Sequence, residues 1–186
     1  RVWQTNTVLG LMGNLYLADD PDYVVEVAAQ LSSCGLTGLH GGKVADAPSD
    51  KQQEILNKVA LRFYRRGSLL AGHSLRDIDV PVASIEMSVS HVYFFEPMTA
   101  QSMGHWDWPV DDLANSTNPR FNKEDRTFSF FGNDKRERVF DYATGKIVRI
   151  ETKAQADARM RALRDCLTTE RKEKASDAPT TPPIVQ

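Results

Sequence analysis

The most regular alternation of apolar and polar residues runs from Val82 to Phe95. Its odd positions are apolar except for His91, whereas the even positions from 84 to 90 are polar. A period of two is typical of a β-strand with one buried and one solvated face. At roughly 3.3 Å per residue such a strand would be about 45 Å long, so we expect it to bend, to bulge or to pass the edge of a sheet.

Upstream of this strand, the spacing of apolar residues predicts helices. A short helix is expected within Thr5–Leu17. A second is expected over Pro21–Ser33, with Asp20 as its N-cap and Gly35 as its left-handed end. The N-terminal part of the chain is therefore predicted to be helical.

A third helix is predicted to follow the capping box Ser49–Gln52, in which Ser occupies the N-cap and Gln the third helical position. It would bury the apolar residues that recur behind the box, namely Leu56, Val59, Ala60 and Phe63. Ser68–Leu75 would add one or two further turns. Pro81 then introduces the long strand.

Downstream, three short alternating segments predict an antiparallel meander over Thr127–Phe130, Arg138–Tyr142 and Lys146–Ile150. Turn residues separate the segments, and Gly145 is placed for a left-handed conformation. We expect the long strand to pair with this meander.

A second capping box, Thr152–Gln155, predicts a C-terminal helix that ends near Lys174. One face of this helix is apolar, with Ala156, Met160, Leu163 and Leu167. The last residues, 177–186, are rich in Pro and are predicted to form a disordered tail.

The order of elements predicts an α+β fold: N-terminal helices, a curved antiparallel sheet of about four strands, and a C-terminal helix. We expect residues 1–176 to form a single domain, with 177–186 as its tail. The sheet needs helices on one face, because its apolar side cannot remain in contact with water.

Charge and composition narrow the classes of partner. The net charge of −2 offers no basic excess to neutralise phosphates, so nucleic-acid binding is not expected. No run of 18 apolar residues is present, so no transmembrane segment is expected, and an anchor upstream of Arg1 stays open. Cys34 and Cys166 fit either a disulfide or two free thiols.

The most distinctive segment lies in the long irregular stretch between the strand and the meander. There Met103, His105, Trp106, Asp107 and Trp108 bring two indoles and an acid into one loop. Trp combines a large apolar area with a polar N–H and is enriched at binding hot spots. The loop is therefore a candidate partner-binding surface, and the alternative is that both indoles pack over the sheet as a lid.

A second candidate site is a pocket at His91, with Tyr93 beside it on the same strand face. A neutral imidazole there would serve as a base or a ligand. None of the four histidines shows the local spacing of a metal site, and no nucleophile motif is present. We therefore expect no catalytic residues, no metal and no cofactor.

These observations favour a non-catalytic protein-interaction or assembly module, a soluble accessory domain that uses the Trp-rich loop. The alternatives are a small-ligand-binding protein or enzyme centred on His91, and an inhibitor or immunity-like protein. A protein partner is expected, with a homo-oligomer as the other form of assembly. The compartment is not predicted.

Overall fold

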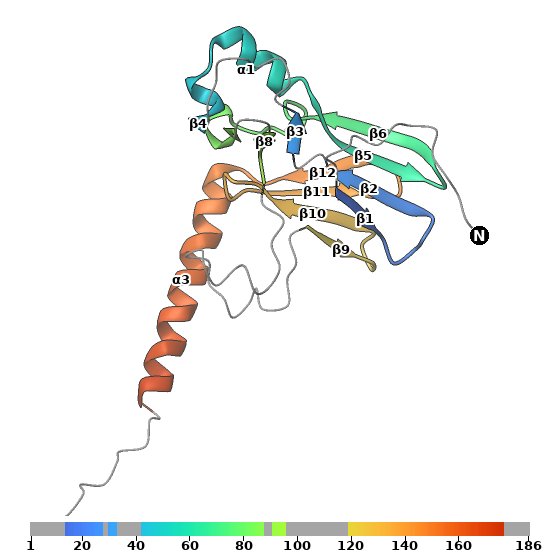
Figure 1. The fold of residues 1–186 in the computed structure, drawn as a ribbon. Coiled ribbons are helices and arrows are strands. Elements are labelled where there is room, and N and C mark those ends of the chain that lie inside the picture. Colours follow the sequence, from blue (N-terminus) through green and yellow to red (C-terminus); the bar gives the residue numbers. More distant parts are fainter. Residues whose placement is uncertain (1–13, 28–29, 33–41, 88–90, 96–118, 177–186) are drawn as a thin grey trace, which may run out of the picture.

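The computed structural model describes residues 14–27, 30–32, 42–87, 91–95 and 119–176 (Figure 1). Its strands form three antiparallel sheets of four strands each, accompanied by helices α1 and α3. The predicted α+β class is therefore confirmed. No helix in these ranges is long and apolar enough to cross a membrane.

Two of the sheets carry the main core, and we name them by their place in the chain. The N-terminal sheet has the order β1-β2-β5-β6, with β1 at Asn14–Leu17, β2 at Tyr23–Val27, β5 at Val59–Arg65 and β6 at Ser68–Ser74. The C-terminal sheet has the order β12-β11-β10-β9, with β9 at Arg120–Asn122, β10 at Thr127–Phe131, β11 at Glu137–Asp141 and β12 at Lys146–Ile150.

The third, small sheet has the order β3-β8-β7-β4 and consists of very short strands. These are β3 at Gln30–Ser32, β8 at His91–Tyr93, β7 at Glu86–Met87 and β4 at Gly42–Lys43. Two 3₁₀ turns accompany it, η1 at Val44–Asp46 and η2 at Val82–Ser84.

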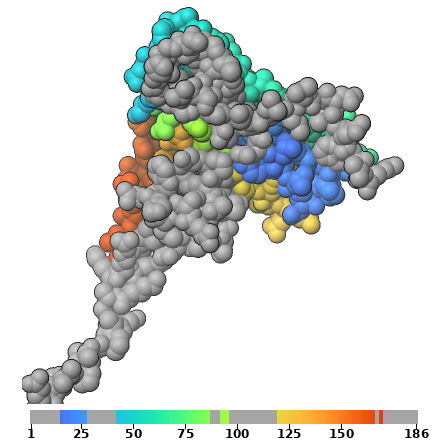
Figure 2. Space-filling view, viewed as in Figure 1, coloured from blue at the N-terminus to red at the C-terminus, as the bar shows by residue number. Residues whose placement is uncertain are grey.

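Aromatic rings join the sheets into one core. The ring of Phe63 on β5 lies 5.4 Å from Phe140 on β11 and 6.1 Å from Phe128 on β10. On the small-sheet side, Phe95 lies 5.2 Å from Phe130. All five rings are almost completely buried. Figure 2 agrees with this arrangement, since the surface of β1 and β2 abuts that of β9 and β10.

One side of this core is fixed by a buried arginine. Arg138 on β11 is 0% exposed, and its guanidinium donates to the carbonyls of Ile78 and Asp79 at 2.7 and 2.9 Å. The same group binds both carboxylate oxygens of Asp134 at 2.9 and 2.8 Å. Arg138 thereby ties the segment before η2 to the C-terminal sheet.

The predicted N-terminal helices are wrong wherever the structure describes them. Asn14–Leu17 is strand β1, and Pro21–Ser33 contains strands β2 and β3. Residues 24–27 of β2 are buried on both faces, so the strand lacks the alternation that would mark it. A short apolar run of this kind cannot be separated from a helix by periodicity, and its β-branched valines favour the strand.

The third predicted helix is real but short, because α1 spans only Ser49–Leu56. Val59–Phe63 belongs to β5 and Ser68–Ser74 to β6. Between these strands Arg66 (φ 49°) and Gly67 (φ 83°) form a tight left-handed turn that ends β5 instead of a helix. Ser49 makes no capping bond, and the Gln52 amide donates to the carbonyls of Ala45 and Ala47 instead.

The single long strand over Val82–Phe95 is also wrong. β7 and β8 pair antiparallel, with Glu86 opposite Tyr93 and Met87 opposite Val92, so the chain reverses direction between them. When apolar and polar residues alternate in both strands of a hairpin, the sequence can resemble one long strand, because the alternation does not reveal where the chain reverses direction. These arms pair with β3 and β4 and not with the meander, so the expected single curved sheet is replaced by three.

The meander and the C-terminal helix are confirmed. β10, β11 and β12 pair in sequence, and Gly145 has the left-handed φ of 71°. Thr152 and Gln155 form the predicted capping box, with the Thr152 N–H donating to Gln155 Oε1 at 2.8 Å. Helix α3 spans Lys153–Ser176 and projects away from the sheets in Figure 1. The predicted tail, 177–186, lies outside the described residues.

Candidate functional site

The register of the C-terminal sheet determines which side chains share its outer face, the face opposite the aromatic core. Ser129 pairs with Arg120 on β9 and with Val139 on β11, and Val139 pairs with Arg149 on β12. Directly paired residues point to the same side of a sheet. Phe131 and Glu137 form the next pair on that side, two residues along each strand.

This face contains an open hollow of about 930 Å³. It is lined by residues of all four strands and of the β9–β10 turn: Arg120, Phe121, Asn122, Lys123, Glu124, Asp125, Thr127, Ser129, Glu137, Val139, Asp141, Val148 and Arg149. A volume of this size falls within the usual range of ligand pockets, about 300–1,000 Å³, and seven of the thirteen lining residues are charged.

A buried carboxylate held by two arginines forms the centre of the hollow. Glu137 is only 7% exposed, and its Oε1 accepts from Arg120 Nη2 at 2.7 Å while Oε2 accepts from Arg149 Nη2. Arg120 Nε also donates to the Ser129 hydroxyl at 3.1 Å. Two guanidinium groups sharing one carboxylate leave one net positive charge at this point of the sheet.

Both arginines keep donors that the sheet does not use. Their side chains are 46% and 51% exposed. In the part of the chain that the structure describes, Nη1 of Arg120 and both Nε and Nη1 of Arg149 have no hydrogen-bond partner. Because an arginine carries five N–H donors in a rigid fork, these groups can bind a ligand without leaving Glu137.

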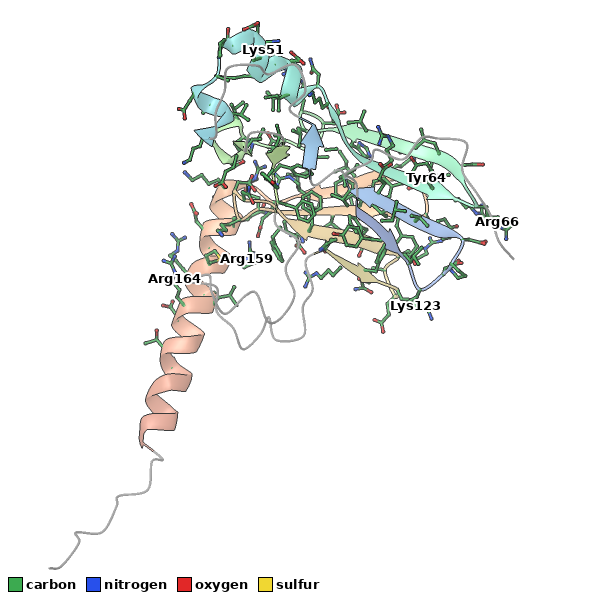
Figure 3. The ribbon with its side chains drawn as sticks, viewed as in Figure 1. Lys51, Tyr64, Arg66, Lys123, Arg159 and Arg164 are labelled. Atoms are coloured by element: carbon green, nitrogen blue, oxygen red, sulfur yellow. The ribbon has the colours of Figure 1, made fainter. Side chains whose placement is uncertain are left out.

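Helix α3 is attached next to this centre through Arg159. Its guanidinium carbon lies 4.7 Å from the centroid of the Phe131 ring, a cation–π contact. Arg159 also donates to both carboxylate oxygens of Glu151 at 3.1 Å. Burial alone would raise the pKa of the Glu151 carboxyl. The hydrogen bonds that its carboxylate accepts from Arg159 and from the Glu137 N–H have the larger combined effect, so the pKa is lowered. Figure 3 shows Arg159 on α3 and Lys123 at the β9–β10 turn, at opposite ends of the sheet.

The turn end of the hollow carries charges of both signs, with more carboxylates than cations. Glu124 and Asp125 lie in the β9–β10 turn. Their backbone N–H groups donate to Asn122 Oδ1 at 2.9 and 3.3 Å, respectively. Asp141 lines the same end and accepts from the Ala143 N–H at 2.8 Å. The hollow therefore has arginines across its middle, and carboxylates together with Lys123 at the turn.

The residues of the predicted Trp-rich loop, Met103 and His105–Trp108, lie outside the described residues, so their role stays a prediction. The chain enters this segment after Phe95 and leaves it at Pro119, and both of these residues are buried. Pro119 directly precedes Arg120, which lines the hollow.

The second predicted site is only partly described. His91 lies on β8 opposite Ser32, but its side chain is outside the described set. Tyr93 is half-buried, and its carbonyl accepts from Asn133 Nδ2 at 3.5 Å. Neither residue lines the hollow on the C-terminal sheet. No group of three potential metal ligands occurs within the ranges that the structure covers.

Sequence reasoning missed Arg120, Glu137 and Arg149. Strand β9 was not predicted, so Arg120 had no place in the sheet. For Arg149 the pattern is misleading: simple alternation puts it on the same face as Ile147, toward the core. In the structure the register shifts by one residue between Val139 and Phe140, and this shift places Arg149 on the outer face.

Comparisons with known proteins add no identity. No family model matches the sequence, and neither a curated protein nor a solved structure matches it. The site must therefore be interpreted from its own chemistry.

Proposed function

We propose that this chain is a non-catalytic protein-interaction module and that the outer face of the C-terminal sheet is its partner surface. The observation that carries the proposal is the hollow with its two half-exposed arginines. Arginine is enriched in protein interfaces, and this face presents Arg120 and Arg149 together. A sheet fixed from behind by an aromatic core gives such a surface a constant shape.

The Trp-rich loop is part of the same proposal. Trp106 and Trp108 precede Arg120, which lines the hollow, by 14 and 12 residues in the sequence. Two indoles would supply the apolar part of an interface whose polar part is the sheet.

Photo-crosslinking at two matched positions tests the proposal. Val148 on β12 is 58% exposed and lines the hollow, whereas Leu69 on β6 is 53% exposed on the other sheet. Each is replaced in turn by benzoylphenylalanine in the full chain, and the crosslinked proteins from the native source are identified. We expect a defined partner from position 148 only, and a weaker yield when Trp106→Ala and Trp108→Ala are added.

If positions 148 and 69 crosslinked to the same set of proteins, or if position 148 gave no crosslinked protein, the assignment of the partner surface would be contradicted. Unchanged crosslinking in the Trp106→Ala and Trp108→Ala variants would remove the loop from the interface and leave the sheet face.

A further inference from the structure

The arginine pair also indicates what kind of partner the hollow accepts. We propose that it binds an acidic peptide segment of the partner protein, with one carboxylate held between Arg120 and Arg149. This inference rests on the proposed function and specifies its chemistry.

The geometry of the pair comes first. Arg120 and Arg149 originate on the two edge strands, β9 and β12, and reach toward each other over the intervening strands. Both bind the carboxylate of Glu137, so their guanidinium groups are held on either side of one point. Ser129 further fixes Arg120 through its Nε. Donors that are oriented before binding lose little conformational entropy when the ligand arrives.

The charge of the pair selects the ligand. Arg120, Arg149 and Glu137 together carry one net positive charge, which a single carboxylate neutralises. A phosphate group carries about −1.5 to −2 at neutral pH and would leave an excess of negative charge beside the buried Glu137. A carboxylate therefore fits this centre better than a phosphate does.

The rest of the hollow specifies the neighbours of that carboxylate. Val139 and Val148 lie beside the arginines and offer apolar contact to the methylene groups of a glutamate side chain. At the turn end, Asp125 and Asp141 accept bonds from peptide N–H groups, while Lys123 can pair with a further acid. The favoured segment thus has a glutamate between the two arginines and polar or charged neighbours toward the β9–β10 turn.

Titration of the isolated full chain with short peptides tests this inference. The probes are N-acetylated, C-amidated hexaglutamate, hexaglutamine of the same length, and inorganic phosphate. Binding is followed by the NMR signals of the arginine Nε–H groups at low ionic strength, where weak ion pairs are least screened. We expect hexaglutamate to shift the Arg120 and Arg149 signals, and hexaglutamine to leave them in place.

A matched pair of variants separates this site from general charge attraction. Arg66 at the β5–β6 turn is 58% exposed and pairs with one carboxylate, Asp22 at 2.7 Å, and Figure 3 shows it at the tip of that hairpin. Arg149→Gln should weaken hexaglutamate binding about fivefold to tenfold, as expected for a charge-assisted bond at a half-exposed site. Arg66→Gln removes the same charge and should leave the affinity unchanged.

Each other outcome overturns the inference. Equal loss in both variants would mean non-specific attraction, and shifts caused by phosphate but not by hexaglutamate would mean a different ligand. If no probe shifts the two arginines while position 148 still crosslinks to a partner, the acidic-segment inference fails and the proposed function stands. If the peptide binds but no partner is crosslinked, the proposed function fails and with it the inference of a partner's acidic segment, and the hollow is a carboxylate site only.

Discussion

Replacing Arg138 by Met is the most informative test of how this fold is held together. The side chain is 0% exposed, and every polar nitrogen of its guanidinium donates to a protein oxygen. Methionine has a similar length but no donor. The substitution therefore leaves the carbonyls of Ile78 and Asp79 and the carboxylate of Asp134 without their main partner, in a site closed to water.

The structure sets the expected size of the effect. Removing one member of a buried ion pair costs about 3–5 kcal/mol, because the remaining charge stays buried without compensation. Asp134 is only 9% exposed but keeps Arg136, whose guanidinium lies 3.8 Å away and whose N–H donates at 3.2 Å, so the lower end of this range applies. Total stabilities of about 5–15 kcal/mol are usual, so we expect Arg138→Met to remove a large share of the free energy of unfolding.

Urea unfolding, followed by circular dichroism, measures this cost against a control in the same sheet. Arg149→Met removes a side chain that is 51% exposed and should cost less than about 1 kcal/mol. Asp134→Asn completes a double-mutant cycle with Arg138→Met, and we expect a coupling free energy above about 1 kcal/mol. Equal costs for Arg138→Met and Arg149→Met, or a coupling near zero, would refute the structural role of the buried arginine.

Two further predictions concern stability. Gly145→Ala should destabilise the fold by about 2–4 kcal/mol, because φ is 71° and the new Cβ would lie 2.5 Å from Ala71 Cβ. Adding Ala71→Gly should recover only the part of that loss that comes from the contact with Ala71, because Phe63 Cβ would still lie 3.2 Å from the new Cβ. Full recovery in urea unfolding would argue against backbone strain. Because the folded-state pKa of Glu151 is lowered from its ordinary 4.5, its carboxylate stabilises the fold above that pH and loses this effect as the pH falls through the folded value. The stability gap between the native chain and Glu151→Gln should therefore shrink between pH 7 and pH 3, and a constant gap would contradict the assigned contacts.

The parts of the fold that sequence reasoning recovered are those in which local signals act alone. The meander was found because each strand alternates and each turn carries its own turn residues, Gly145 among them. The box at Thr152 and Gln155 begins α3 for the same local reason. Neither prediction required knowledge of a distant partner.

The parts that were missed depend on contacts between distant segments. Val24, Val25 and Val27 can pack as one helical face or as a strand covered on both sides, and pairing with β5 decides between them. The same applies to Val59–Phe63. The spacing of its apolar residues extends the pattern of the preceding helix, but in the structure this segment lies in the middle of a sheet. Tertiary pairing overrides local spacing at such positions.

The candidate site was missed because its members come from separate strands. Arg120 and Glu137 are 17 residues apart, and Arg149 is 12 residues beyond Glu137. No local motif connects them. The mixed-charge run Lys135–Arg138 by itself favours a solvated edge of the sheet, with a docking surface for an acidic partner as the alternative. In the structure that run divides, with Arg138 buried in the core and Glu137 on the opposite face.

Two of the sheet edges, β6 and β12, are irregular and disfavour the binding of a partner as an added strand. Leu70 on β6 and Val148 on β12 are exposed where the register shifts, so each of these two edge strands carries a bulge. Bulges interrupt the ladder of backbone groups and disfavour the addition of a foreign strand.

On β12 the bulge has a second effect. With Phe140 opposite Ile147, an unbroken ladder would pair Arg149 with Arg138 on the core side, whereas the extra residue pairs it with Val139 on the outer side. One irregularity thus discourages strand addition at β12 and brings the second arginine to the hollow.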